Sequence, residues 1–343
     1  GNFEEMIKNY KELIAKYPKS QFRFESWLIL GDYYFDKGDI DEAISNYRSI
    51  LKNPETYAHN MARYKLAWCY INKDKNSLAV DLWEQAIKTP TPPEPGTDAN
   101  LSSLSDKPKR LDVRQDALRD LAYYYAEARD PKTALPFFQN LTVSRQEYKT
   151  ALEKLARRFQ IKTMYEESAK VYRELIRISA DVDRNLEWAE AVYEAAVAAK
   201  DLAHADADVI MLAEVSARFK YWWRANDEDK KILKDFEMLT RDLSTRLHAL
   251  AKEKGDPDLY ARAANAYESY LSVFDDSSER LAMEWNYAET LFAAKRFVRS
   301  GRQYEQVLGL VGGAPTGAAA KAAPAAAAKP DSKPDSKPDA KAP

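Results

Sequence analysis

The sequence predicts an all-α protein made of antiparallel helix pairs stacked in a row, and three observations support this prediction. Leu, Ala, Glu, Lys, Arg and Tyr are prominent, and only 10 glycines occur among 343 residues, a composition that favours helices over sheets. One spacing of apolar and small residues recurs along the chain. At this length a single compact core is unusual, so an array of repeated units is expected.

The recurring spacing is clearest between residues 23 and 178. Successive copies lie 36 residues apart from Ala43 to Ala79, and 34 residues apart from Ala134 to Ser168. The four copies are Trp27, Leu30, Gly31, Tyr34, Ala43, Tyr47 and Ile50; Leu66, Ala67, Tyr70, Ala79, Trp83 and Ala86; Leu118, Leu121, Ala122, Tyr125, Ala134, Phe138 and Leu141; and Leu152, Leu155, Ala156, Phe159, Ser168, Tyr172 and Leu175.

Each copy predicts two helices and a turn. Pairs four residues apart, such as Leu30 with Tyr34, share one helix face that turns inward. Gly31 and its equivalents must be small, because the two helices approach closely there. Gly38 suits a helix C-terminus, and Asp39 followed by Glu42 predicts an N-cap with a capping-box partner. Asp130-Pro131 predicts the same kind of helix start in the third copy.

This spacing resembles the tetratricopeptide repeat, a helix-turn-helix unit of 34 residues with the pattern W-x2-L-G-x2-Y…A-x3-F. The resemblance implies a right-handed α-solenoid of antiparallel helix pairs. We expect four helical segments. Residues 1–20 form the second helix of a truncated repeat, which further sequence precedes. Residues 21–178 form the regular array, 179–245 form divergent helical repeats, and 246–311 form C-terminal repeats.

Two segments do not fit the repeat. Residues 89–112 are rich in Pro, Ser and Asp where a short turn belongs, so we expect a mobile insertion loop. Residues 312–343 are of low complexity and repeat the sequence KPDS, so we expect a disordered, semi-extended tail.

No residue pattern predicts catalysis, a metal site or a cofactor. The three histidines have no partner at metal-ligand spacing and are explained as surface or interface imidazoles. Cys69, the single cysteine, is better explained as a small buried apolar residue than as a nucleophile. A formal net charge of −2 argues against nucleic-acid binding. No apolar run reaches the ~20 residues that span a bilayer. The sequence therefore predicts a protein that is not an enzyme.

The first helices of stacked pairs line a concave groove, and residues one step from the core positions point into it. We predict a partner-binding groove with an aromatic floor and an acidic rim over its first third. It suits an extended or helical protein segment with apolar and basic residues. The groove residues are Glu25, Leu28, Asp32, Phe35, Met61, Tyr64, Trp68, Asn72, Arg119, Tyr123 and Glu127.

A second surface is suggested by Tyr221, Trp222 and Trp223. Three consecutive aromatic residues cannot all face one side of a helix, so at least one is exposed or contacts a neighbour. Packing against the next repeat is the simpler explanation, and a patch for a protein partner is the alternative.

The predicted function is that of a non-catalytic scaffold that binds protein partners; the sequence leaves the oligomeric state open. In its aromatic-rich array and its tail of Ala, Pro, Lys and Asp, the chain is similar to tetratricopeptide-repeat proteins of the bacterial envelope, including those of gliding-motility and trans-envelope complexes. That similarity implies a periplasmic or envelope-associated location. The alternative is a regulatory or substrate-recruiting domain of a larger enzyme, or part of a cytoplasmic complex.

Overall fold

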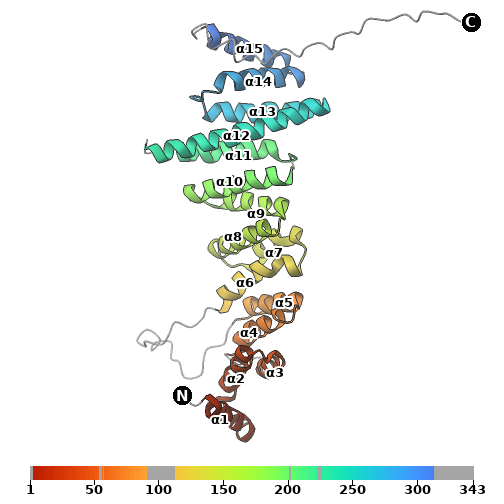
Figure 1. Cartoon of the computed structure of the whole chain (residues 1–343), viewed down its shortest axis with the longest axis vertical. Helices are drawn as coiled ribbons and strands as arrows, with labels where there is room; N and C mark the ends of the chain where they lie inside the picture. The colour runs from red at the N-terminus through yellow and green to blue at the C-terminus, as the bar shows by residue number, and fades with distance from the viewer. Residues whose placement is uncertain are drawn as a thin grey trace, which may run out of the picture. The chain divides into compact units, whose positions relative to one another are not determined.

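The computed structural model describes residues 3–53, 56, 58–90, 113–200, 202–221 and 226–312. The regular secondary structure of these residues is helical, and within each part of the chain neighbouring helices pack against one another (Figure 1). The chain divides into two compact units, residues 1–201 and 202–343. Residues 91–112 of the predicted insertion loop and 313–343 of the predicted tail lie outside the described part of the chain.

The first unit consists of single helices and pairs that follow one another along the chain. They are α1 (Phe3–Lys16), α2 (Arg23–Lys37), α3 (Ile40–Leu51), α4 (His59–Ile71), α5 (Asn76–Lys88), α6 (Val113–Ala128), α7 (Ala134–Leu141), α8 (Arg145–Ile161), α9 (Tyr165–Ile178) and α10 (Val182–Ala199). A single 3-10 turn, Pro131–Thr133, precedes α7. The segment 179–245, predicted as divergent repeats, includes α10 and extends into the second unit.

Almost all of the predicted core positions are buried and form the core of this unit, but Trp27 and Tyr34 are only half-buried, so the inward face predicted for Leu30 with Tyr34 holds for Leu30 alone. Tyr47, Trp83, Phe138 and Leu155 are almost completely buried, and each such side chain contributes about 1.5–3 kcal/mol through the apolar surface it removes from water. Gly31 lies against the ring of Tyr47, where a methyl group would come within 2.7 Å of Cζ. The small residue thus sets the distance between α2 and α3, as the spacing predicts.

The helix ends follow the sequence less closely than the core does. Gly38 ends α2 in the left-handed conformation with φ of 81°, as predicted. Asp39 occupies the N-cap of α3, but its side chain makes no capping hydrogen bond, so the predicted capping box is wrong. Asp130 accepts a hydrogen bond from the backbone N–H of Lys132 at 3.0 Å, with Pro131 at the first helical position, as predicted.

The second unit contains α11 (Ala205–Tyr221), α12 (Asp227–Lys254), α13 (Pro257–Val273), α14 (Arg280–Ala293) and α15 (Phe297–Gly312). Its core includes Leu243, Leu247, Tyr267 and Leu291, all with 1% exposure or less. The helix α12 has 28 residues, whereas α13 and α14, which follow it, have 17 and 14. Within the described residues, no helix is both long and apolar enough to cross a bilayer.

Candidate functional site

Four of the predicted groove residues line one cavity between α2 and α4. Asp32 and Phe35 come from α2, and Tyr64 and Trp68 come from α4. The cavity has a volume of about 280 Å³. Three further residues complete its walls: Asp36, Tyr47 and Lys65. We call this site the α2–α4 hollow.

The carboxylate of Asp32 in the α2–α4 hollow is already bound by groups of the same chain. Tyr47 donates its hydroxyl to Asp32 Oδ1 at 2.6 Å, and Lys65 Nζ lies 2.8 Å from the same oxygen. Burial, and then the hydrogen bond to Asp32, raises the pKa of the Tyr47 hydroxyl, which therefore stays protonated and keeps donating. The negative charge of Asp32 is thus largely neutralised, whereas Asp36 on the rim is exposed.

Trp68 and Tyr64 also hold α4 against α6. The Trp68 ring makes edge contacts with Trp83 of α5 and Tyr124 of α6, at centroid distances of 5.5 and 5.9 Å. Tyr64 donates to Asp120 Oδ2 at 2.8 Å across the same joint. Burial raises the pKa of Asp120, although hydrogen bonds from Tyr64 and Trp68 oppose this rise. The predicted aromatic floor is therefore partly a structural joint.

Two predicted groove residues of α6, Tyr123 and Glu127, are bound by cationic side chains. One is Arg158 of α8, and the other is Lys162, the residue that follows α8. The guanidinium of Arg158 lies 4.2 Å from the Tyr123 ring centroid and donates to its hydroxyl at 2.9 Å. Arg158 Nε and Lys162 Nζ lie 3.2 and 3.0 Å from Glu127 Oε1. Burial acts to raise the pKa of Glu127, but the hydrogen bonds and charges of Arg158 and Lys162 outweigh it and lower that pKa.

The other predicted groove residues lie outside this cavity. Leu28 and Met61 are half-buried, and Glu25, Asn72 and Arg119 are exposed. Asn72 donates to the carbonyl of Trp68 at 2.9 Å, and Arg119 pairs with Asp116. The structure thus gathers Asp32, Phe35, Tyr64 and Trp68 into one site and does not gather these five with them.

A hollow with the same position in the repeat lies between α8 and α10. This second cavity has a volume of about 530 Å³. Four of its lining residues have the same spacing as four residues of the α2–α4 hollow: Arg157, Gln160, Ile161 and Tyr172 correspond to Asp32, Phe35, Asp36 and Tyr47. Its charges are reversed, since Arg157 from the earlier helix pairs with Glu187 from the later helix at 3.1 Å. The α2–α4 hollow is therefore a feature of the repeat and not of one pair alone.

The cysteine and two of the histidines, the residues best suited to catalysis or metal binding, lie in structural positions. Burial raises the pKa of Cys69 to about 12, so its thiol is protonated at neutral pH. His59 is not on the surface, since it is 5% exposed and its Nε2 lies 3.3 Å from the carbonyl of Leu51. His248 Nδ1 lies 3.1 Å from the Tyr267 hydroxyl. Burial lowers the pKa of both imidazoles and favours their neutral form. Among the described residues, no three His, Cys, Asp or Glu side chains form a metal-binding group.

The second predicted patch is described only at its first residue. Tyr221 is 82% exposed at the end of α11. Trp222 and Trp223 lie outside the described part of the chain.

The sequence analysis missed the basic side chains that neutralise the groove carboxylates. Lys65, Arg158 and Lys162 each come from the helix pair that follows the carboxylate they bind. A signal was present, because Asp32 is a predicted groove residue and Lys65 follows directly on Tyr64, a predicted groove residue of the next copy. The prediction counted charges on one helix at a time and did not pair them across helices.

The comparisons with known proteins agree with the repeat pattern. Residues 1–53 and 28–95 match the family model described as tetratricopeptide repeat. No curated protein matches the chain at a significant level.

Three solved structures are among the matches to this chain. A chain of the Naa15/Naa10 complex bound to HypK-THB is 18% identical, with a TM-score of 0.38. The match includes 90% of the present chain but only 46% of the length of the Naa15/Naa10 chain. The C-terminal part of a TPR repeat-containing protein from Cytophaga hutchinsonii is 12% identical, with coverages of 82% and 94% and a TM-score of 0.35. The apo quorum sensor NprR from B. thuringiensis is 14% identical, with coverages of 90% and 82% and a TM-score of 0.30.

Proposed function

Because residues 1–95 carry tetratricopeptide repeats, we propose that this chain is a non-catalytic scaffold that holds segments of partner proteins at the α2–α4 hollow. The observation that carries the proposal is the open cavity beside Phe35, since the predicted groove residues Tyr123 and Glu127 are bound by Arg158 and Lys162 of the same chain. A cavity of about 280 Å³ accepts one or two apolar side chains.

The charges of the hollow favour a partner segment with a basic residue beside its apolar anchor. Asp32 is neutralised by Lys65 and Tyr47, so the exposed carboxylate of Asp36 is the one that remains available. A basic side chain that reaches Asp36 adds orientation more than affinity, because the site is open to solvent.

Site-specific photo-crosslinking tests the location. A photoreactive residue at Phe35 in the full-length chain is expected to capture a defined partner segment in extracts of the source cell, which mass spectrometry then identifies. The matched control carries the same residue at Leu78, which is exposed on α5 and does not line the hollow. Equal capture of the same segments at both positions would refute the proposed site.

A charge variant then tests the chemistry with the captured segment as a synthetic peptide. Asp36→Lys is expected to weaken its binding about fivefold to tenfold, since one exposed ion pair contributes up to ~1 kcal/mol and its reversal adds repulsion. Glu42→Lys makes the same charge change on the exposed part of α3 and is expected to have no effect. Similar weakening by both variants would show that only net charge matters.

We also propose the bacterial cell envelope as the setting of this scaffold, within a motility or trans-envelope complex. This proposal is supported by the composition of the sequence, namely its aromatic-rich repeats and the Ala, Pro, Lys and Asp residues of 312–343. Fractionation of the source cells, with detection of the endogenous protein by antibody, tests it. Recovery in the cytoplasmic fraction would favour the alternative, a recruiting domain of a cytoplasmic complex or a larger enzyme.

A further inference from the structure

We propose that the N-terminal part of α12 and the α13–α14 loop form a second binding site, separate from the α2–α4 hollow, for an acidic protein segment that carries an apolar side chain. The site lies wholly within the second unit. The proposal is independent of the function proposed for the first unit, and its failure would leave that function untouched.

The first observation is that α12 extends well beyond the length its packing requires. None of the residues 227–235 is buried, and the first buried side chain of the helix is Phe236. These residues amount to about two and a half turns of helix. A stretch of helix with no buried side chain, in which Ile232 and Leu233 are only half-buried, gains little stability from packing.

The second observation is a cavity of about 430 Å³ along this extension. One stripe of α12 forms a wall, because Lys230, Leu233, Lys234 and Glu237 share a helix face. The opposite side is formed by Lys220 at the end of α11 and by Phe274, Asp276, Ser277 and Ser278 of the α13–α14 loop. We call this cavity the α12 hollow.

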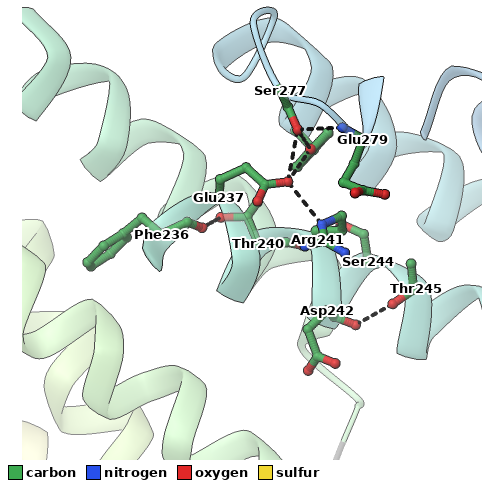
Figure 2. Close-up of polar contacts among 10 residues, drawn as sticks. Phe236, Glu237, Thr240, Arg241, Asp242, Ser244, Thr245, Ser277 and Glu279 are labelled. Atoms are coloured by element: carbon green, nitrogen blue, oxygen red, sulfur yellow. Dashed lines mark hydrogen bonds and ion pairs between the residues drawn. The ribbon is translucent and has the colours of Figure 1, made fainter. Parts of the chain in front are cut away.

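The loop side of the α12 hollow is fixed by a hydrogen-bond network around Glu237. Figure 2 shows Glu237 and Arg241 of α12 beside Ser277 of the loop. Glu237 Oε1 accepts from Tyr270 at 2.5 Å, from Ser277 at 3.1 Å and from Arg241 at 2.9 Å. Ser277 also accepts from the backbone N–H of Glu279 at 3.1 Å. The loop is therefore held in place before any partner arrives, which lowers the entropic cost of binding.

The same network decides which charges are available to a partner. Oε1 of Glu237 accepts from three donors, one of which is the cationic guanidinium of Arg241. Lys220 is held by the carbonyl of Val273 at 3.1 Å and by Asp275 at 3.2 Å. Among the described residues, Lys230 pairs with Asp227 at 3.3 Å, an exposed ion pair that contributes little. Lys234 makes no ion pair with any described residue. The available charge on the α12 wall of the hollow is thus positive, while Asp276 across the hollow lies 3.7 Å from Lys220 Nζ and the first turn of α12 carries Asp227, Glu228 and Asp229.

The remaining features favour a protein segment over other anionic partners. Leu233 and Phe274 give the α12 hollow an apolar surface between the charges, which suits a Leu or Phe side chain flanked by carboxylates. Nucleic acid requires a broad basic face, whereas this chain has a formal net charge of −2 and carries Asp227 at the end of the same helix. The apolar residues of the cavity lie between two walls, α12 and the α13–α14 loop, whereas a membrane surface is flat.

The experiment uses the full-length protein and a fluorescein-labelled peptide of alternating Glu and Leu residues, with binding measured by fluorescence polarisation at low salt. The parent protein is expected to bind the peptide. The double variant Lys230→Glu, Lys234→Glu is expected to bind it at least about tenfold more weakly. The matched control Lys252→Glu, Lys254→Glu reverses two exposed lysines at the other end of α12 and is expected to change affinity less than about twofold.

A third variant, Leu233→Ser, distinguishes insertion of the peptide's Leu side chains into the α12 hollow from attraction by charge alone. It is expected to weaken binding by about fivefold, while circular dichroism shows unchanged helicity in every variant. The proposal is overturned if the parent does not bind the peptide, if both lysine pairs weaken binding equally, or if Leu233→Ser has no effect. Tighter, lysine-dependent binding of a single-stranded oligonucleotide or of anionic phospholipid vesicles would overturn the assignment to a protein segment.

Discussion

Gly31 is the residue on which the packing of the first helix pair depends most directly. A methyl group at this position would lie 2.7 Å from Cζ of Tyr47, a ring that is 1% exposed and fixed by its hydrogen bond to Asp32. Gly31→Ala is therefore expected to lower the free energy of unfolding by about 1–3 kcal/mol through overpacking. Urea unfolding followed by circular dichroism measures the change.

The matched control is Gly301→Ala, in the helix α15. No atom lies within 4 Å of the position its methyl group would take. This variant is expected to raise the free energy of unfolding by up to about 1 kcal/mol, since alanine favours helix over glycine. If both alanine variants stabilised the protein, the close approach of α2 and α3 would be wrong.

The lowered pKa of Glu127 predicts that its contribution to the free energy of unfolding depends on pH. Its pKa in the folded chain is lowered, so its contribution is fully present above the ordinary value of 4.5 and is lost as the pH falls through the lower folded value. The difference in free energy of unfolding between the parent and Glu127→Gln is therefore expected to shrink below a pH of about 4.5. Chemical unfolding at several pH values measures that difference.

The control for this measurement is Glu42→Gln. Glu42 is exposed on α3 and makes no ion pair with any described residue. Its replacement is expected to leave the free energy of unfolding unchanged within about 0.5 kcal/mol at each pH. A pH-independent difference between the parent and Glu127→Gln would contradict the role given to Arg158 and Lys162.

At the level of single residues, the sequence predicted burial better than it predicted charge. The recurring apolar slots identified Tyr47, Trp83, Phe138 and Leu155 as core, because burial follows from helix periodicity alone. The neutralisation of Asp32 by Lys65 could not be read in the same way. Ion pairs between successive repeats depend on how the helices stack, which a periodic pattern does not specify.

At the level of helices, half of the capping box predicted at α3 occurs instead at the α8 N-terminus, where the N-cap side chain accepts from the N3 backbone N–H but Glu147 binds the residue before the N-cap. Ser144 accepts a hydrogen bond from the backbone N–H of Glu147 at 3.1 Å. Glu147 in turn accepts from the N–H of Val143 at 3.0 Å. The Ser-x-x-Glu spacing was visible in the sequence but was not used, and the Asp39-x-x-Glu42 spacing that was used forms no such bond.

This difference leads to a paired prediction. Ser144→Ala is expected to lower the free energy of unfolding by about 1 kcal/mol, because the N–H of Glu147 loses its acceptor. Asp39→Ala is expected to change it by less than about 0.5 kcal/mol, since no capping bond is lost. Equal losses in the two variants, measured by urea unfolding, would argue that cap geometry does not distinguish these helix starts.

The length of α12 shows the limit of sequence reasoning at this level. Apolar residues at helical spacing predicted a helix in this region, and the structure contains it. Residues 227–235 continue the helix without burying a side chain, so the apolar pattern does not mark their extent. Their start is set instead by Asn226, which accepts from the N–H of Asp229 at 2.7 Å. The α12 hollow was missed because it depends on that start.

At the level of the whole molecule, the repeat resemblance predicted stacked helix pairs throughout, and the structure divides them into two compact units near residue 201. The boundary falls where the repeat pattern is weakest, between α10 and α11. Lys200 ends α10 in the left-handed conformation, with φ of 53°, without a glycine to mark the site. A periodic pattern predicts the units that repeat, but it does not predict an irregular helix end such as that at Lys200.

The two units are expected to fold independently, since each has its own apolar core, around Trp83 and Leu155 in the first and around Leu247 and Tyr267 in the second. Stability in stacked repeats comes from each helix pair and its neighbours, so separating the units leaves most of these contacts intact. Fragments 1–200 and 202–343 should each unfold cooperatively in urea. The Gly31→Ala loss should then appear in full in the first fragment. An unfolded second fragment would show that its core depends on the first unit.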